Sequence, residues 1–159
     1  MISLLINGLN PMKAKLFTTL TVTLLTLIGC ASVPMSDKTA NDEALKFTPP
    51  PGMANIYIIR DELGATALLA NATIDGQRIA DLPTETYVMK SISPGVHTIG
   101  CINLNNNLLW TPITLTAQAG QNYFFETECS FWAHRFPIKQ VTFEEAREML
   151  KSCDRVQGM

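Results

Sequence analysis

The sequence predicts a mainly β protein, a β-sandwich of about seven antiparallel strands with one C-terminal helix, preceded by a cleaved signal peptide. Short runs rich in β-branched and aromatic residues alternate with turn residues such as Asp75-Gly76 and Pro94-Gly95. Helical periodicity occurs once in the domain, at its C-terminal end. Near the N-terminus, two lysines precede an apolar run that is too short to span a bilayer.

The strands are bounded by turn residues. Asp75-Gly76 indicates a two-residue hairpin, and Pro94-Gly95 and Asn105-Asn106-Asn107 indicate further turns. In chain order, the predicted strands are 55–60, 67–74, 77–82, 86–92, 96–104, 110–117 and 123–129.

Alternation along two strands predicts which side chains face the core. His97, Ile99 and Cys101 share one face of their strand. On the last strand Glu126 and Glu128 indicate a solvent-exposed face. The opposite face of that strand is therefore predicted to point inward, and it comprises Tyr123, Phe125, Thr127 and Cys129.

The C-terminal helix is predicted to begin at a capping box formed by Thr142 and Glu145. After it, apolar residues recur at spacings of three and four, which places them on one face of the helix. That face is expected to pack on the sheet and comprises Phe143, Ala146, Leu150 and Cys153.

The apolar run ends in Leu27-Ile28-Gly29-Cys30, which resembles the lipobox of bacterial lipoproteins. This resemblance implies cleavage between Gly29 and Cys30, a diacylglyceryl group on the Cys30 thiol, and acylation of the new amine. Ala31 stands where lipoproteins of the inner membrane usually carry aspartate, so the resemblance implies an outer-membrane protein, which we expect to face the periplasm.

Three segments follow from these patterns. Residues 1–29 are the signal peptide, within which 1–11 are interpreted as sequence upstream of the true start at Met12. Residues 30–53 are the lipidated cysteine and a flexible Pro-rich tether, and 54–159 are the sandwich domain with its C-terminal helix. The prolines near position 50 favour extended chain, which would hold the domain clear of the headgroups.

The composition of the mature chain argues against several partners. After cleavage it retains ten basic and fourteen acidic residues, for a net charge of −4. Since no Lys/Arg cluster remains, the sequence indicates no nucleic-acid binding, and the membrane is expected to be contacted through the lipid anchor.

A set of ordered motifs resembles a bacterial lipoprotein family. The motifs are Ile74–Leu82, Tyr87, Pro94–Ile99, Ala119–Phe124 and Phe136–Val141. The family they resemble is described as a domain of unknown function and is related to PEGA-like, prealbumin-like sandwiches. The resemblance implies a fold and an envelope location, and it implies no catalytic residues.

Little in the sequence indicates chemistry beyond the anchor. No phosphate-binding loop, catalytic carboxylate pair or serine elbow is present, so the sequence predicts no enzyme, no metal and no cofactor other than the lipid on Cys30. The alternative is a periplasm-facing enzyme or metal-binding module in which His97, Cys101 and Cys129 converge on one face.

The three cysteines that follow Cys30 lie in an exported chain, where disulfides form. Cys101 with Cys129 is the favoured pair because both are expected to face one core. Cys129 with Cys153 is the alternative, which would join the helix to the sheet.

Phe131, Trp132 and Phe136 form a candidate interaction patch, the alternative being that they cover the core beneath the helix. Together these features predict a non-enzymatic envelope lipoprotein that acts as a structural or interaction module and binds another envelope component, either a protein or a glycan.

Overall fold

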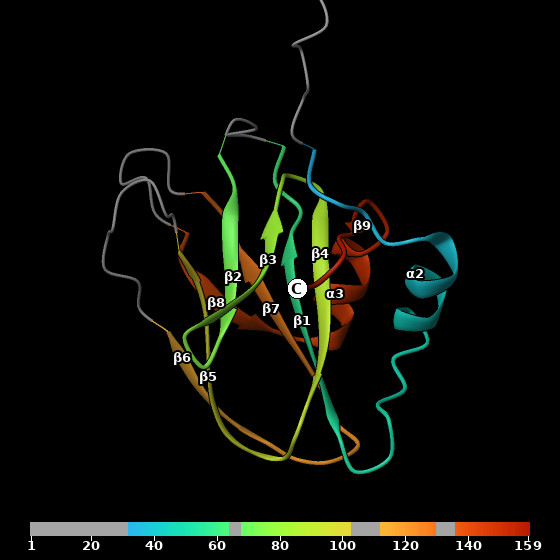
Figure 1. Ribbon diagram of the computed structural model, residues 1–159, viewed down its shortest axis with the longest axis vertical. Helices are drawn as coiled ribbons and strands as arrows, with labels where there is room; N and C mark the ends of the chain where they lie inside the picture. Colours follow the sequence, from blue (N-terminus) through green and yellow to red (C-terminus); the bar gives the residue numbers. More distant parts are fainter. Residues whose placement is uncertain (1–31, 64–67, 103–111, 130–135) are drawn as a thin grey trace, which may run out of the picture. The chain divides into compact units, whose positions relative to one another are not determined.

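Two β-sheets build the domain (Figure 1). The computed structural model describes residues 32–63, 68–102, 112–129 and 136–159. One sheet has the strand order β8-β7-β1-β4-β9 and the other has the order β3-β2-β5-β6. In chain order the elements are α2 (Lys38–Ala44), β1 (Ala54–Arg60), β2 (Ala70–Ile74), β3 (Gln77–Leu82), β4 (Thr86–Ile92), β5 (Gly95–Ile102), β6 (Ile113–Ala117), β7 (Asn122–Thr127), β8 (Ile138–Val141), α3 (Phe143–Met149) and β9 (Asp154–Arg155).

The mainly β prediction is confirmed, but the strand pairing differs from the predicted all-antiparallel arrangement. Nine strands occur in the described residues, and β1 pairs in parallel with β7, as β4 does with β9. The two additional strands, β8 and β9, are only four and two residues long. Segments this short are too brief to show an alternating pattern in the sequence.

The β2–β3 hairpin turns at Asp75-Gly76, as the sequence predicts. Both residues have positive φ, 53° for Asp75 and 76° for Gly76. A two-residue turn of this kind matches the right-handed twist of the paired strands, which is why Asp-Gly is favoured there.

The main core lies between the two sheets. Ile56 and Ile58 of β1 and Phe125 of β7 belong to the same buried cluster as Ala72 of β2 and Ile99 of β5. The inward prediction for the face of β7 that carries Phe125 is therefore confirmed. Val33, ahead of every strand, also packs against this cluster.

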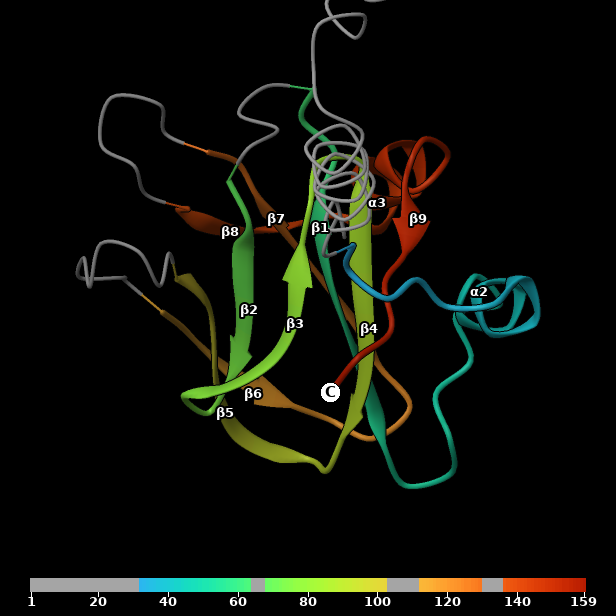
Figure 2. The same ribbon diagram turned by 45° about the horizontal axis from the view of Figure 1, so that its top comes forward.

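A second core covers the opposite face of the five-stranded sheet, where Figure 2 shows α2 and α3. Tyr57 and Phe124 cluster there with Ala44 of α2 and Ala146 of α3. The predicted solvent exposure of this face is wrong for Phe124 and Glu126, which are each only 4% exposed, and is confirmed for Glu128, which follows the last residue of β7 and is exposed. Alternation fixes the period of a strand but not what covers each face.

The segment predicted to be a flexible tether is part of the fold from Val33 onward. Asp37 caps α2 by accepting a hydrogen bond from the Ala40 amide. The Tyr57 hydroxyl donates to the Ala44 carbonyl at 2.6 Å, and the Tyr87 hydroxyl bonds to Asn41 Oδ1 at 2.7 Å. Two buried tyrosines need polar partners for their hydroxyls, and this segment supplies them.

The N-terminal segment is joined to the C-terminal tail. Met35 and Val156 form an antiparallel bridge, and the Gln157 amide donates to the Pro34 carbonyl at 2.8 Å. The tail itself is hydrogen-bonded to both sheets. The Val156 amide donates to the Tyr87 carbonyl of β4, and the Met159 amide donates to the Ile79 carbonyl of β3. It therefore closes one side of the sandwich.

Candidate functional site

The structure does not bring His97, Cys101 and Cys129 together. His97 is at the start of β5, and Cys101 is four residues further along the strand, a separation of about 13 Å. Both imidazole nitrogens of His97 have other partners. Nδ1 lies 2.7 Å from Asp75 Oδ2, and Nε2 lies 2.9 Å from the Ser93 carbonyl oxygen. Within the described parts of the chain, no group of three His, Cys, Asp or Glu side chains is placed to hold a metal ion.

The His97–Asp75 pair fastens the β2–β3 turn to β5. Asp75 Oδ1 accepts the Thr98 amide at 2.8 Å, so one carboxylate contacts both a side chain and the backbone of β5. The hydrogen bond from Asp75 raises the pKa of His97, and the hydrogen bond from His97 lowers the pKa of Asp75. The histidine is a structural residue in this arrangement.

The His97–Asp75 pair should make stability depend on pH. The pKa of His97 is higher in the folded state than in the unfolded state. Its contribution to folding stability is therefore complete below the unfolded pKa of about 6.5 and is lost as pH rises through the folded pKa. Asp75 contributes to folding stability above its unfolded pKa. Because its folded pKa is lowered, that contribution is lost only in acid, below about pH 4. As the pH is raised from about 6 to about 9, we expect the urea midpoint of the wild type to decrease more than that of His97→Gln. Equal pH profiles for the two proteins would contradict the role assigned to the pair.

The structure contains neither of the predicted disulfides. Cys101, Cys129 and Cys153 are free thiols. Cys101 and Cys129 contact the core between the sheets, whereas Cys153 belongs to the cluster on the opposite face of the five-stranded sheet. Facing one core, which is all that strand alternation indicates, does not set the short Cβ separation that a disulfide requires.

Burial makes these thiols poor nucleophiles. It raises the pKa of Cys101 and of Cys153 to about 12, and it raises the pKa of Cys129 as well. Since the thiolate is the reactive form, thiols with raised pKa values react slowly at neutral pH.

Arg60 is the central polar residue of the domain, and the sequence patterns did not predict its role. It is the last residue of β1, and its side chain is fully buried. The guanidinium contacts Glu62 at 2.7 Å through Nε and Nη2, and its Nη1 donates to the carbonyls of Leu68 and Leu82 at 2.6 and 2.9 Å. The Phe136 ring lies 4.9 Å from the guanidinium carbon, within range for a cation–π interaction.

The contacts of Arg60 join four segments at one end of the sandwich. These segments are the loop after β1, the residues just before β2, the end of β3 and the residues just before β8. The contacted residues are, in that order, Glu62, Leu68, Leu82 and Phe136. Glu62 extends the network, because its Oε2 accepts the Cys129 amide at 2.5 Å. An arginine at the end of a continuous apolar run, followed two residues later by a glutamate, is the signal in the sequence that could have indicated a buried pair.

Only one member of the predicted aromatic patch lies in the described residues. Phe136 is 4% exposed and belongs to the core between the sheets, so it does not offer an interaction surface. Phe131 and Trp132 lie outside the described residues, and their part of the patch stays a prediction. The same holds for the lipidation residues Gly29 and Cys30.

A small hollow of about 80 Å³ lies beside β7 and β8, lined by Glu126, Glu128, Pro137, Ile138 and Lys139. The Glu126 carboxylate is paired with Lys139 Nζ at 2.9 Å, and burial raises the pKa of Glu126. The volume is well below the few hundred Å³ of a typical small-molecule site, so the hollow suits water better than an organic ligand.

The described helices contain no segment that is both long and apolar enough to cross a membrane. Searches of curated proteins and of solved structures found no match. Residues 50–137 match the family model described as protein of unknown function (DUF2846). The match spans more than half of the chain and covers the region from the end of the Pro-rich stretch to Pro137. The chain therefore belongs to the DUF2846 family.

Proposed function

We propose that the mature chain is a lipid-anchored lipoprotein of the bacterial outer membrane that faces the periplasm and binds another envelope component, a protein or a glycan. The observation that carries the proposal is Leu27-Ile28-Gly29-Cys30 at the end of the apolar run, with the folded unit beginning at Val33. In this account Cys30 carries the lipid and the sandwich is the interaction module.

The chemistry of the side chains supports a binding role over a catalytic one. His97 is engaged by Asp75 and Ser93, and burial raises the pKa of each described thiol. Arg60 is fully buried in contacts that organise loops. The two-sheet architecture and the Asp75-Gly76 hairpin also support the PEGA-like, prealbumin-like description that we propose for the sandwich.

Replacing Cys30 with alanine should release the protein from membranes. The thiol is the only proposed attachment point, and two or more acyl chains hold a protein on a bilayer far more firmly than one. We expect Cys30→Ala to leave the membrane pellet or to remain as the unprocessed precursor, with the urea midpoint of its domain unchanged. Ser32→Ala is the matched control and should fractionate as the wild type does. If mature-sized Cys30→Ala stays with the outer membrane, the proposal fails.

Replacing Ala31 with aspartate tests the proposed destination. Aspartate directly after the lipidated cysteine is the usual signal for retention in the inner membrane, so Ala31→Asp should move the protein to the inner-membrane fraction of a density gradient. Ala31→Ser should leave it in the outer-membrane fraction. An unchanged distribution of Ala31→Asp would contradict outer-membrane sorting by this position.

Crosslinking in intact cells, followed by mass spectrometry of the crosslinked peptides, tests the binding role. A recurrent envelope protein or glycan attached to the wild type but not to Cys30→Ala is the expected result. Only self-crosslinks and lipids in the wild type would contradict it.

A further inference from the structure

The folded domain begins almost immediately after the proposed lipid anchor. Val33 packs against the core between the sheets, and the Pro34 carbonyl and the Met35 backbone are bonded to the C-terminal tail. Only Ala31 and Ser32 separate Cys30 from Val33. Three Cα–Cα steps reach at most about 11 Å, so the chain is too short to hold a domain clear of the headgroups.

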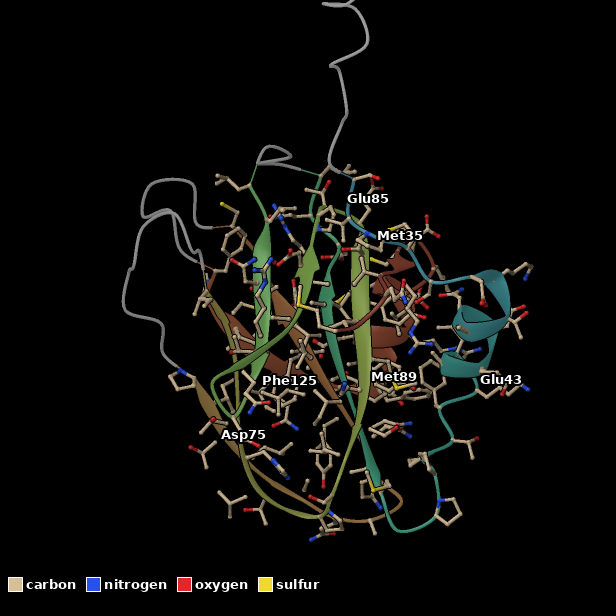
Figure 3. The ribbon with its side chains drawn as sticks, in the orientation of Figure 1. Met35, Glu43, Asp75, Glu85, Met89 and Phe125 are labelled. Carbon is tan, nitrogen blue, oxygen red and sulfur yellow. The ribbon has the colours of Figure 1, made fainter. Side chains whose placement is uncertain are left out.

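The strand pairing shows which end of the sandwich lies next to the two-residue connection between Cys30 and Val33. Arg60, at the end of β1, pairs with Thr86, at the start of β4. The tail residue Val156, bridged to Met35, bonds to Tyr87, the second residue of β4. Figure 3 accordingly shows Met35 and Glu85 at one end of the sandwich and Asp75 toward the other. We call the end with Met35, residues 61–63 after β1 and the β3–β4 turn the anchor end.

Exposed apolar side chains occur at the anchor end. Met35 is 45% exposed, and the β1–β2 connection carries Leu63 at 75% and Leu69 at 40%. Glu85 and Asp154, which are also exposed there, are joined by a backbone hydrogen bond from the Asp154 amide to the Glu85 carbonyl. Apolar side chains with acidic neighbours suit a zwitterionic headgroup surface better than an anionic one.

We propose that the sandwich rests directly on the bilayer through its anchor end, with Leu63 and Met35 against the headgroups. The proposal rests on the proposed lipidation of Cys30 and adds an orientation to it. The occupant of this surface is the phospholipid of the membrane that holds the anchor. The opposite end, with the Asp75-Gly76 turn and Val96, stands a strand length away, about 20 Å, and is the end that a partner beyond the membrane meets.

An environment-sensitive fluorophore at two positions tests the orientation. Leu63→Cys and Val96→Cys are matched sites, because both side chains are strongly exposed, at 75% and 70%. Each is made in a Cys129→Ser background, since Cys129 is only partly buried. The full-length proteins are purified lipidated, labelled, and placed in phosphatidylcholine vesicles that contain lipids with a quencher in the headgroup region. Label at Leu63→Cys should lose most of its fluorescence, and label at Val96→Cys should keep it.

A lengthened connection identifies the cause. Inserting about 20 Gly/Ser residues between Ser32 and Val33 adds a coil that spans roughly 25 Å, which should restore most of the fluorescence at Leu63→Cys. Persistent quenching after the insertion would overturn the role of the short connection. Equal quenching at both positions, or none at Leu63→Cys, would overturn the orientation.

The mass of each purified protein separates the two proposals. A lipidated Cys30 combined with unquenched Leu63→Cys refutes only the orientation. A chain without lipid on Cys30 refutes the proposed function, and the orientation with it.

Discussion

Arg60→Met should destabilise the domain by about 3–5 kcal/mol, the cost expected when one partner of a buried ion pair is removed. The methionine fills a similar volume but leaves the Glu62 carboxylate without its guanidinium and the Leu68 and Leu82 carbonyls without their donor. Glu62 also loses its orientation toward the Cys129 amide. Urea denaturation at neutral pH measures the effect.

Two control variants separate burial from charge in the Arg60 result. Arg78→Met removes an arginine whose pair with Asp81 is at the surface, with 36% of the Arg78 side chain exposed, and it should cost at most about 1 kcal/mol. Arg60→Met combined with Glu62→Met should be more stable than Arg60→Met alone, because the unpaired carboxylate is then absent. A loss for Arg60→Met no larger than that for Arg78→Met would contradict the assigned network.

Phe124→Ala should cost about 3–5 kcal/mol, the range for truncating a buried phenylalanine. Its ring lies 4.9 Å from that of Tyr57 and 5.9 Å from that of Phe47, which joins the sheet to the N-terminal segment. The cavity should therefore weaken the packing of α2 as well as the sheet. The urea midpoint gives the overall loss, and faster amide exchange in 38–44 shows its spread to α2.

Phe143→Ala is the matched control for Phe124→Ala. Phe143 belongs to the same ring cluster, at 5.1 Å from Phe47 and 5.6 Å from Phe124, but it is 41% exposed and lies at the start of α3. Its loss should cost clearly less, about 1–2 kcal/mol, because less apolar area returns to water. If both variants lose the same stability, the second core is not organised around Phe124.

Much of the local structure could be predicted from the sequence. The Asp75-Gly76 turn, the strand that ends at Arg60 and the capping box of Thr142 and Glu145 were all predicted, and the structure shows each of them. These features depend on residues adjacent in the chain, such as positive φ at a turn or the reach of a side chain to a helix amide. Short-range chemistry of this kind is readable without knowing the tertiary structure.

The structural features that the sequence did not predict depend on contacts between distant segments. Helix α2 is seven residues long, too short to be stable alone, and it is held by hydroxyls of Tyr57 and Tyr87 that come from other strands. The parallel pairing of β9 with β4 likewise requires the tail to return to the edge of the five-stranded sheet. The burial of Glu126 depends on Lys139 of a neighbouring strand, so a glutamate that looked exposed is enclosed.

The candidate site shows the same division. Strand alternation placed Cys101 and Cys129 toward the same core, which the structure confirms, but it gave no distance between them. It also grouped His97 with them, because alternation carries no information about the Asp75 carboxylate that contacts His97 from the neighbouring strand turn. The strand pattern included Arg60 but indicated nothing of its burial, because its partners come from four segments.

The mass of the mature N-terminal peptide decides whether Cys30 holds this domain on the membrane. The protein is purified from outer membranes and digested with trypsin, and the mass of the peptide that ends at Lys38 is measured before and after hydrolysis of ester-linked lipid. We expect this peptide to begin at Cys30 and to carry diacylglycerol on its thiol and an acyl chain on its amine. A peptide that begins elsewhere, or that begins at an unmodified Cys30, would contradict the claim that this domain is held on the membrane by Cys30.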